Sequence, residues 1–356
     1  MKLRRMFVLL FCAAVLLTAW GNVFSQEAAY TPPALEQEGG WTMVVVPDPQ
    51  QYTSTRNFPL LEMMMNWIAE NRKPLNIQNV VCVGDLVNNN ADDAQWDFIS
   101  RGFAILDGKL VYVPCTGNHD YGKTPPAADT RESKVSVHFP LDRNPAWDGV
   151  LAEAGENAFG VKNIENAAYV QTAPNGQKIV ILCLQFAPSD KNLEWAKAFA
   201  AKPEYQDAFV VVVTHLYMLP GARGNKYDIG RHYPVLKEDG NQGEDIWKKL
   251  VAPSPNIRLV LCGHHSGTDN PADCTGFRTD KNDAGKTVYQ MIFDTQALGG
   301  GFGGNGGDGW LRLLEFSADM KHVKVKTFSP FFAISPTTRS LAVDQVDYNR
   351  FEFDID

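Results

Sequence analysis

The stretch LVYVPCTGNHD, residues 110–120, joins a short apolar run to the polar cluster Gly117-Asn118-His119-Asp120. Its continuous run of Leu, Val, Tyr and Cys predicts a β-strand that is buried on both faces. The four residues that follow begin with a turn former and continue with side chains that can bind an ion or move a proton. A buried strand that stops at such a cluster is the pattern that organises the rest of the chain.

The same pattern occurs four more times, with helical patterns between the strands. The further strands and the clusters that end them are residues 41–47 with Asp48, 79–83 with Gly84-Asp85, 209–214 with His215, and 257–262 with Gly263-His264-His265. The predicted helices are residues 58–71, 93–106, 192–201 and 244–250. Because strands that alternate with helices are typical of α/β proteins, we predict an α/β fold.

The second half of the chain contains strands with few helices between them, which predicts a second sheet, partly antiparallel, packed on the first. These strands are residues 168–171, 178–184, 288–293, 311–316 and 323–328. Three long polar segments, residues 121–166, 216–243 and 267–285, follow strand-end clusters, and we expect them to surround a site. The sequence shows no internal repeat and no low-complexity linker, so we predict one domain over residues 26–356.

The first 25 residues have the features of a signal peptide. Lys2, Arg4 and Arg5 precede a nearly unbroken apolar run over residues 6–19, and small residues before Gln26 fit a cleavage site. Fourteen apolar residues fall short of the roughly twenty that a membrane-spanning helix needs. We therefore expect an exported protein, periplasmic or secreted, with no membrane span in its mature form. The alternative is an uncleaved anchor.

The net charge and the cysteine content limit the classes of protein to which this chain can belong. The formal charge is −8, and removal of the three basic residues in the leader leaves 30 basic and 41 acidic residues, or −11. An acidic surface disfavours nucleic-acid partners, because proteins that bind nucleic acids neutralise the phosphate backbone with basic side chains and release its counterions. Five mature cysteines without paired spacing predict buried free thiols, although one disulfide is possible in an oxidising compartment.

The polar clusters at the strand ends predict one shared site. Taken alone, Asp48 and Asp85 fit turn formers, and His215 fits a buried core histidine. Five strand ends that each deliver such residues indicate more, because ligands of α/β sheets bind at the carboxyl ends of strands. Aspartate, asparagine and histidine together suit a pair of divalent cations about 3.5–4 Å apart, bridged by one carboxylate. Such a pair activates water as hydroxide against a phosphate, and a free imidazole can protonate the leaving oxygen.

The order of these motifs resembles the calcineurin-like metallophosphoesterase superfamily. The motifs that carry the resemblance are Asp48-Pro49-Gln50, Gly84-Asp85-Leu86-Val87-Asn88, Gly117-Asn118-His119-Asp120, His215 and Gly263-His264-His265-Ser266. The resemblance extends from about Val44 to Phe328, and the Asp-Pro-Gln motif is typical of one variant branch. It implies a four-layer αββα sandwich, in which two mixed β-sheets are flanked by helices.

The resemblance also implies a role for each residue of the site. Asp85 would bridge two divalent cations, which can be Mn, Fe, Zn or Mg. The second cation would be held by Asn118, His215 and His264, and the first by Asp48 and Gln50. His119 would act as the general acid, with Asp120 orienting it.

Two positions depart from the family pattern, and both fall on the first cation. The family usually has histidine where this chain has Gln50, and again where it has Ser266. The first site is therefore expected to bind weakly, to prefer a harder ion such as Mn or Mg, or to stay empty. Replacement of the missing imidazole by His265 is an alternative. The purple acid phosphatase branch does not fit, because its metal-binding tyrosine would fall at Asn88.

A glycine-rich segment over residues 299–309 formally contains a dinucleotide-binding pattern. The alternating run at residues 310–316 follows it, whereas that motif must open a helix, so we reject a nucleotide cofactor. Two interpretations of the segment stay open. Either Asn305 and Gln296 line the site, or the segment is a simple flexible hairpin.

The sequence thus predicts an exported, metal-dependent phosphoesterase that hydrolyses phosphate esters through metal-activated hydroxide, with His119 as general acid. The expected substrate is a phosphorylated small molecule or protein. One alternative is a strict phosphodiesterase or pyrophosphatase. The other is a non-catalytic binding protein on the same fold, which the substitutions at Gln50 and Ser266 favour.

Overall fold

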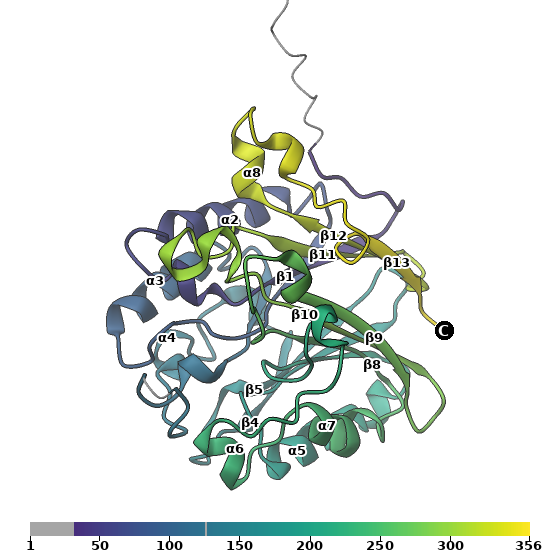
Figure 1. Ribbon diagram of the computed structural model, residues 1–356. Coiled ribbons are helices and arrows are strands. Elements are labelled where there is room, and N and C mark those ends of the chain that lie inside the picture. The colour runs from purple at the N-terminus through teal and green to yellow at the C-terminus, as the bar shows by residue number, and fades with distance from the viewer. Residues whose placement is uncertain (1–31, 125–126) are drawn as a thin grey trace, which may run out of the picture.

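The computed structural model describes residues 32–124 and 127–356, and the predicted signal peptide lies outside this part of the chain. The described residues form two mixed β-sheets with helices on their outer faces, so the predicted four-layer αββα arrangement is confirmed (Figure 1). Among the described helices, none is both long and apolar enough to cross a membrane.

The first sheet combines the start and the end of the described chain. Its strand order is β13-β12-β11-β1-β2-β3. The strands are β1 (Trp41–Val46), β2 (Ile77–Cys82), β3 (Val111–Pro114), β11 (Leu311–Phe316), β12 (His322–Phe328) and β13 (Phe351–Asp354). β1, β2 and β3 run parallel, whereas β11, β12 and β13 are joined by antiparallel pairing.

The second sheet is formed by the middle of the chain in the order β4-β5-β6-β7-β8-β10-β9. The strands are β4 (Leu151–Glu156), β5 (Lys162–Thr172), β6 (Lys178–Cys183), β7 (Phe209–Val213), β8 (Ile257–Cys262), β9 (Thr275–Lys281) and β10 (Thr287–Phe293). Its central strands β6, β7, β8 and β10 are parallel, and both edges are antiparallel. The two sheets are mixed, as expected. Antiparallel strands occur in both sheets, whereas the sequence predicted them for the second sheet.

Burial explains why β7 is apolar without interruption. In β7, Phe209, Val211 and Val213 face the main core between the sheets, whereas Val210 and Val212 face a second core. This second core lies beneath α5 (Asp190–Ala200) and α7 (Gly243–Ile246), which continues as a π-helical segment, Trp247–Val251. Because successive side chains of a strand point to opposite faces, a strand between two cores needs apolar residues at every position.

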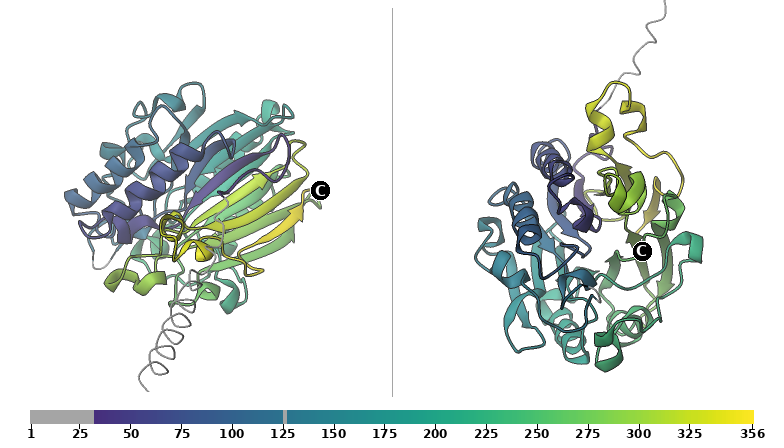
Figure 2. Two further views of the ribbon diagram at one scale, coloured as in Figure 1. Left: turned by 90° about the horizontal axis from the view of Figure 1, so that it is seen from above. Right: turned by 60° about the vertical axis from the view of Figure 1, so that its left-hand side comes forward.

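Helices of the first part of the chain cover the other sheet. They are α2 (Phe58–Asn71), α3 (Asp93–Ala104) and the short α4 (Val135–His138), and Figure 2 shows these purple and blue helices together on one side of the sheets. α2 has the predicted bounds, and its buried face includes Leu61, Met64 and Ile68. Two further short helices, α6 (Pro234–Glu238) and α8 (Pro330–Ile334), lie in the connections of the second half.

The three long polar segments are more ordered than the sequence indicated. β4 and the first residues of β5 lie within residues 121–166, and β9 lies within residues 267–285. The prediction also omitted β13. The four cysteines predicted in or beside strands are buried there, and all five cysteines of the described chain are free thiols, with Cys274 also buried.

Candidate metal centre

Six polar side chains meet where strands of the two sheets end. In the first sheet, Asp48, Asp85 and Asn118 follow β1, β2 and β3. In the second sheet, His215, His264 and Asp294 follow β7, β8 and β10 in the same way. These strands are parallel within each sheet, so their carboxyl ends lie at one edge and their side chains converge there.

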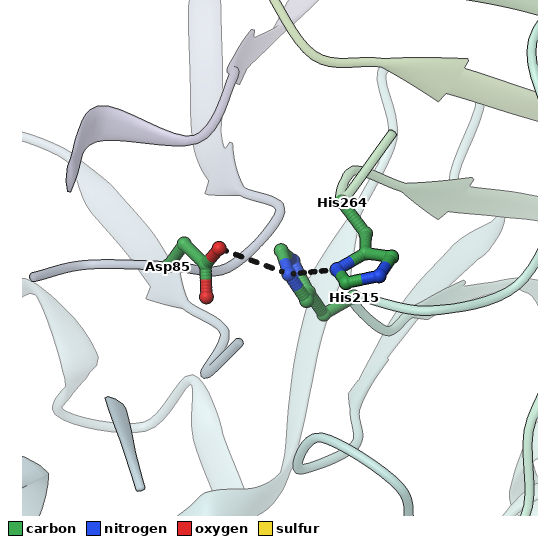
Figure 3. A group of neighbouring side chains, drawn as sticks. All are labelled: Asp85, His215 and His264. Carbon is green, nitrogen blue, oxygen red and sulfur yellow. Dashed lines mark hydrogen bonds and ion pairs between the residues drawn. The ribbon is translucent and has the colours of Figure 1, made fainter. Parts of the chain in front are cut away.

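His215 Nε2 is the centre of this cluster. It lies 3.3 Å from Asp85 Oδ2, 3.1 Å from Asn118 Oδ1 and 3.2 Å from His264 Nδ1. Figure 3 shows Asp85 and His264 on either side of the His215 ring, and ligand atoms of these three residues lie within 4.8 Å of one another. The arrangement brings together four groups that commonly bind divalent cations.

The hydrogen bond on the other side of the His215 ring fixes what Nε2 can do. Nδ1 is 2.9 Å from the carbonyl oxygen of Val83, to which it donates its proton. Nε2 then faces two oxygen acceptors and a second imidazole nitrogen, so it needs either a proton or a metal ion. A metal-binding histidine usually donates its other N–H to a carbonyl or carboxylate in this way.

The electrostatic environment favours the ligand forms of two of these residues. Burial works to raise the pKa of Asp85, but the adjacent His215 and His119 hold it below the usual aspartate value. Burial lowers the pKa of His264 well below the usual histidine value, and His215 adds to this effect. An ionised carboxylate and a neutral imidazole are the states that bind metal.

The backbone at the site is held in unusual conformations. Asp85 and His264 are non-glycine residues with φ of 47° and 77°. Each left-handed residue of this kind costs about 1–3 kcal/mol, and such strain persists mainly at functional sites. The strained backbone therefore supports a functional role for these two residues independently of their side-chain chemistry.

Two glycines of the motifs are required by close approach of the ligands. A Cβ atom on Gly117 would lie 2.1 Å from Asp85 Oδ1, and one on Gly263 would lie 2.0 Å from Asp48 Oδ1. Both distances are shorter than any real contact, so any larger residue would displace a carboxylate from the site. The absence of a side chain at Gly117 and Gly263 thus allows Asp85 and Asp48, which follow other strands, to pack closely against them.

The Asp48 side of the site contains buried acceptors without a donor. Among the described residues, Asp48 Oδ1 and Gln50 Oε1 are buried and have no hydrogen-bond partner. The other Asp48 oxygen accepts the N–H of His264 at 2.9 Å. Since an unpaired buried acceptor is costly, these two oxygens fit a place for a bound cation. Asp48 and Gln50 would thus suit the predicted first cation position.

His119 lies at the rim, half-buried, and its orientation differs from the prediction. Its ring Nδ1 is 2.8 Å from the carbonyl oxygen of Asn88, and its backbone N–H donates to Asp85 Oδ1 at 2.9 Å. The Asp120 carboxylate instead accepts the backbone N–H groups of Leu86, Val87 and Gly117. Asp120 therefore holds the Asp85 loop against the Gly117 turn, and the Asn88 carbonyl orients the His119 ring.

The two residues after His264 are also accounted for. His265 Nε2 lies 2.5 Å from Asp228 Oδ2, so the His265 ring is hydrogen-bonded to the Asp228 carboxylate. Ser266 Oγ accepts the backbone N–H of Ala297 at 2.9 Å. The alternative in which His265 replaces the missing imidazole is thus disfavoured by its pairing, and Ser266 anchors the segment after β10.

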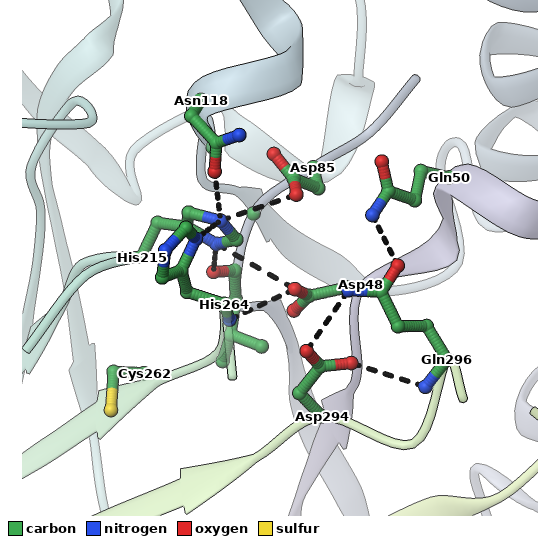
Figure 4. Close-up of polar contacts among 12 residues, drawn as sticks. Asp48, Gln50, Asp85, Asn118, His215, Cys262, His264, Asp294 and Gln296 are labelled. Atoms are coloured by element: carbon green, nitrogen blue, oxygen red, sulfur yellow. Dashed lines mark hydrogen bonds and ion pairs between the residues drawn. The ribbon is translucent and has the colours of Figure 1, made fainter. Parts of the chain in front are cut away.

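Sequence reasoning missed Asp294, the fully buried residue that follows β10 directly. Figure 4 shows it beside Asp48, with Gln296 next to both. The same rule that found the other ligands, a polar residue at the end of a buried strand, applies to it. Of the two residues proposed to line the site, Gln296 contacts Gln50, whereas Asn305 accepts the N–H groups of Gly307 and Asp308 within its own loop.

Comparison with known proteins agrees with this geometry. The family model described as calcineurin-like phosphoesterase matches residues 42–266. An uncharacterized protein of Bacillus subtilis, YvnB, is 30% identical over 315 residues, which cover 87% of this chain and 21% of the relative. This chain therefore spans about a fifth of the length of that relative.

The chain is also similar to solved structures. The purple acid phosphatase from seeds of yellow lupin (Lupinus luteus) is 14% identical, with a TM-score of 0.48 over 90% of this chain and 55% of that one. GAP50, the anchor in the inner membrane complex of Plasmodium, is 10% identical, with a TM-score of 0.42 over 89% of this chain and 88% of that one.

Proposed function

Because this chain belongs to the calcineurin-like phosphoesterase family, we propose that it is a metal-dependent hydrolase of phosphate esters. The observation that carries the proposal is the convergence of Asp85, Asn118 and His264 within 3.3 Å of His215 Nε2. These four residues would hold one divalent cation. Asp48 and Gln50, whose buried oxygens lack donors, would hold the other together with Asp85.

The chain's own residues determine how a phosphate ester would react here. Bound divalent cations would polarise the phosphoryl oxygens and lower the pKa of a water molecule. Asp85 is fixed by the His119 N–H and by the Asp120-bound loop, so its carboxylate is held in place before substrate binds. His119 is the half-buried imidazole at the rim, and with Nδ1 directed to Asn88, its Nε2 is available to protonate the leaving oxygen.

The experiment that tests this function is hydrolysis of p-nitrophenyl phosphate and bis-p-nitrophenyl phosphate by the metal-depleted protein. Mn, Zn or Mg is added separately, and His215→Ala is assayed in parallel. We expect turnover that requires metal and that His215→Ala abolishes, and the preferred ester then separates a monoesterase from a diesterase. Failure of the folded wild-type protein to bind metal or to turn over either ester would instead favour a binding protein.

We also propose that the protein is exported, with a phosphorylated small molecule or phosphoprotein outside the cytoplasm as substrate. The support is the basic start and apolar run of residues 2–19, followed by small residues before Gln26. Expression of the full chain in a bacterial host should yield a processed protein whose N-terminal sequence begins at Gln26. Recovery of the intact chain in the membrane fraction would favour the uncleaved anchor.

A further inference from the structure

Three buried carboxyl groups share the Asp48 side of the site. Asp48 and Asp85 are 1% exposed and Asp294 is 0% exposed. The Asp48 and Asp294 carboxyl groups lie next to each other (Figure 4), and burial together with Asp294 works to raise the pKa of Asp48. Ionised carboxylates are acceptors only, so this contact requires a proton or a cation between them. The contact joins a predicted ligand to a residue that the family motifs do not include.

A chain of side-chain amides links Asp294 to Gln50. Gln296 Nε2 donates to Asp294 Oδ2 at 3.1 Å, which leaves Gln296 Oε1 to accept from Gln50 Nε2. Because the acceptor at the end of this chain is a carboxylate, the direction of both amides is fixed. The Gln50 amide nitrogen is thereby committed to Gln296, and the buried Gln50 Oε1 is the atom without a partner.

The segment after β10 is held where a family imidazole is absent. Ser266 Oγ accepts the Ala297 N–H at 2.9 Å, and the Asp294 N–H donates to the Cys274 carbonyl at 2.9 Å. Serine is small enough to let this segment approach the end of β8. Ser266 thus holds this segment, and Asp294 lies at the same edge of the site because it follows β10, which pairs in parallel with β8.

We propose that the first cation position of this chain is an oxygen-only site in which Asp294, supported by Gln296, takes the place of the missing histidine. Its donors are the carboxylates of Asp48, Asp85 and Asp294 and the amide oxygen of Gln50. This inference rests on the proposed function, since it assigns the ligands of the same two-cation centre.

Charge and donor chemistry agree with this assignment. Two divalent cations bring four positive charges against the three carboxylates of Asp48, Asp85 and Asp294, which leaves one for an anionic phosphate ligand. A site of carboxylate and carbonyl oxygens suits Mn²⁺ or Mg²⁺, whereas the position that contains His215 and His264 also suits Zn²⁺.

The test is Mn²⁺ binding by the metal-depleted full chain, measured by calorimetry and by electron paramagnetic resonance. Wild type should bind two Mn²⁺ ions per chain. Asp294→Asn keeps the shape of the side chain but removes its charge. We therefore expect one of the two Mn²⁺ affinities to fall by at least roughly 10–100-fold, which is the loss caused by mutation of a residue that only supports a metal ligand. Asp280→Asn is the matched control, because that carboxylate pairs with Arg278 on β9.

Thermal unfolding gives a second readout that a merely structural role would not move in this way. In chelator, Asp294→Asn should melt at the same temperature as wild type or higher, because it relieves the contact with Asp48. In saturating Mn²⁺, the variant should gain less in melting temperature than wild type does. A variant that melts lower in chelator and keeps the full gain with Mn²⁺ would show Asp294 to be structural and would overturn the inference.

Two further outcomes separate this inference from others. If wild type binds two Mn²⁺ ions and Asp294→Asn leaves both affinities unchanged, the inference is wrong while the proposed function stands. If wild type binds no metal, the proposed function itself fails. Gln296→Leu cuts the amide chain but leaves Asp294 in place, so an effect as large as that of Asp294→Asn would show that Asp294 acts only by orienting Gln50.

Discussion

Asp85→Asn is expected to lower metal-dependent hydrolysis by roughly three orders of magnitude, equivalent to a loss of about 4 kcal/mol in transition-state stabilisation. Asp85 Oδ2 lies 3.3 Å from His215 Nε2, and Asp85 also lies close to Asp48. Loss of its negative charge therefore weakens both proposed cation positions at once. No other single substitution in the site is expected to affect both to the same degree.

The substitution separates charge from shape. Asparagine can still accept the His119 N–H, as Asp85 Oδ1 does at 2.9 Å. It also tolerates the left-handed backbone at this position, where φ is 47°. The variant should therefore keep the fold, and circular dichroism and the melting temperature in chelator should be close to those of wild type.

The measurement is kcat/KM with saturating Mn²⁺, together with the number of bound metal ions per chain. Asp280→Asn, on β9, serves as the control and should match wild type in both. If Asp85→Asn retains metal and activity while the control also does, Asp85 does not bridge the cations, and the proposed arrangement of the centre is wrong.

His119→Asn is expected to lower turnover of an alkyl phosphate ester by about 10²–10⁴-fold, the usual contribution of a general acid. An alkoxide leaves poorly without a proton, whereas p-nitrophenolate leaves readily without one. The loss should therefore be much smaller for the nitrophenyl ester of the same class. The His119 ring is held by the Asn88 carbonyl, whereas Asn118 and His264 contact His215, so the metal content should not change.

His322→Asn is the control for this experiment, because that imidazole lies on β12 and pairs with Asp354 and Glu352. It should leave both esters unaffected. An equal loss of His119→Asn activity on alkyl and nitrophenyl esters, with metal retained, would show that His119 binds the phosphate and does not protonate the leaving oxygen. Loss of metal would place His119 among the residues that shape the centre.

The two substitutions that distinguish this chain from the family pattern have different consequences in the structure. Gln50 still places an unpaired oxygen in the site, so its departure preserves the kind of donor that a hard cation needs. Ser266 is not among the proposed ligands, and its hydroxyl holds the backbone after β10. From sequence, these two changes were expected to leave the first cation position weak or empty. The contacts of Asp294, Gln296 and Gln50 instead favour the proposal that Asp294 completes this position.

Sequence alone determined where the central strands lie and which residues follow them. β8 and β11 have the predicted bounds, because most of their residues are apolar and polar or turn-forming residues follow them. The candidate ligands Asp48, Asp85, Asn118, His215 and His264 were predicted from the same pattern. Each lies two to four residues after the end of its strand, so the local pattern was enough.

The tertiary structure decided what depends on contacts between distant parts of the chain. The omitted strands β4, β9 and β13 are all sheet edges with partly exposed residues, so no apolar run marks them, and the alternation of β13 covers only four residues. Asp120 binds the loop after β2, and Asp294 meets Asp48 across the two sheets. Such pairings follow from how the sheets stack, and no spacing along the sequence encodes them.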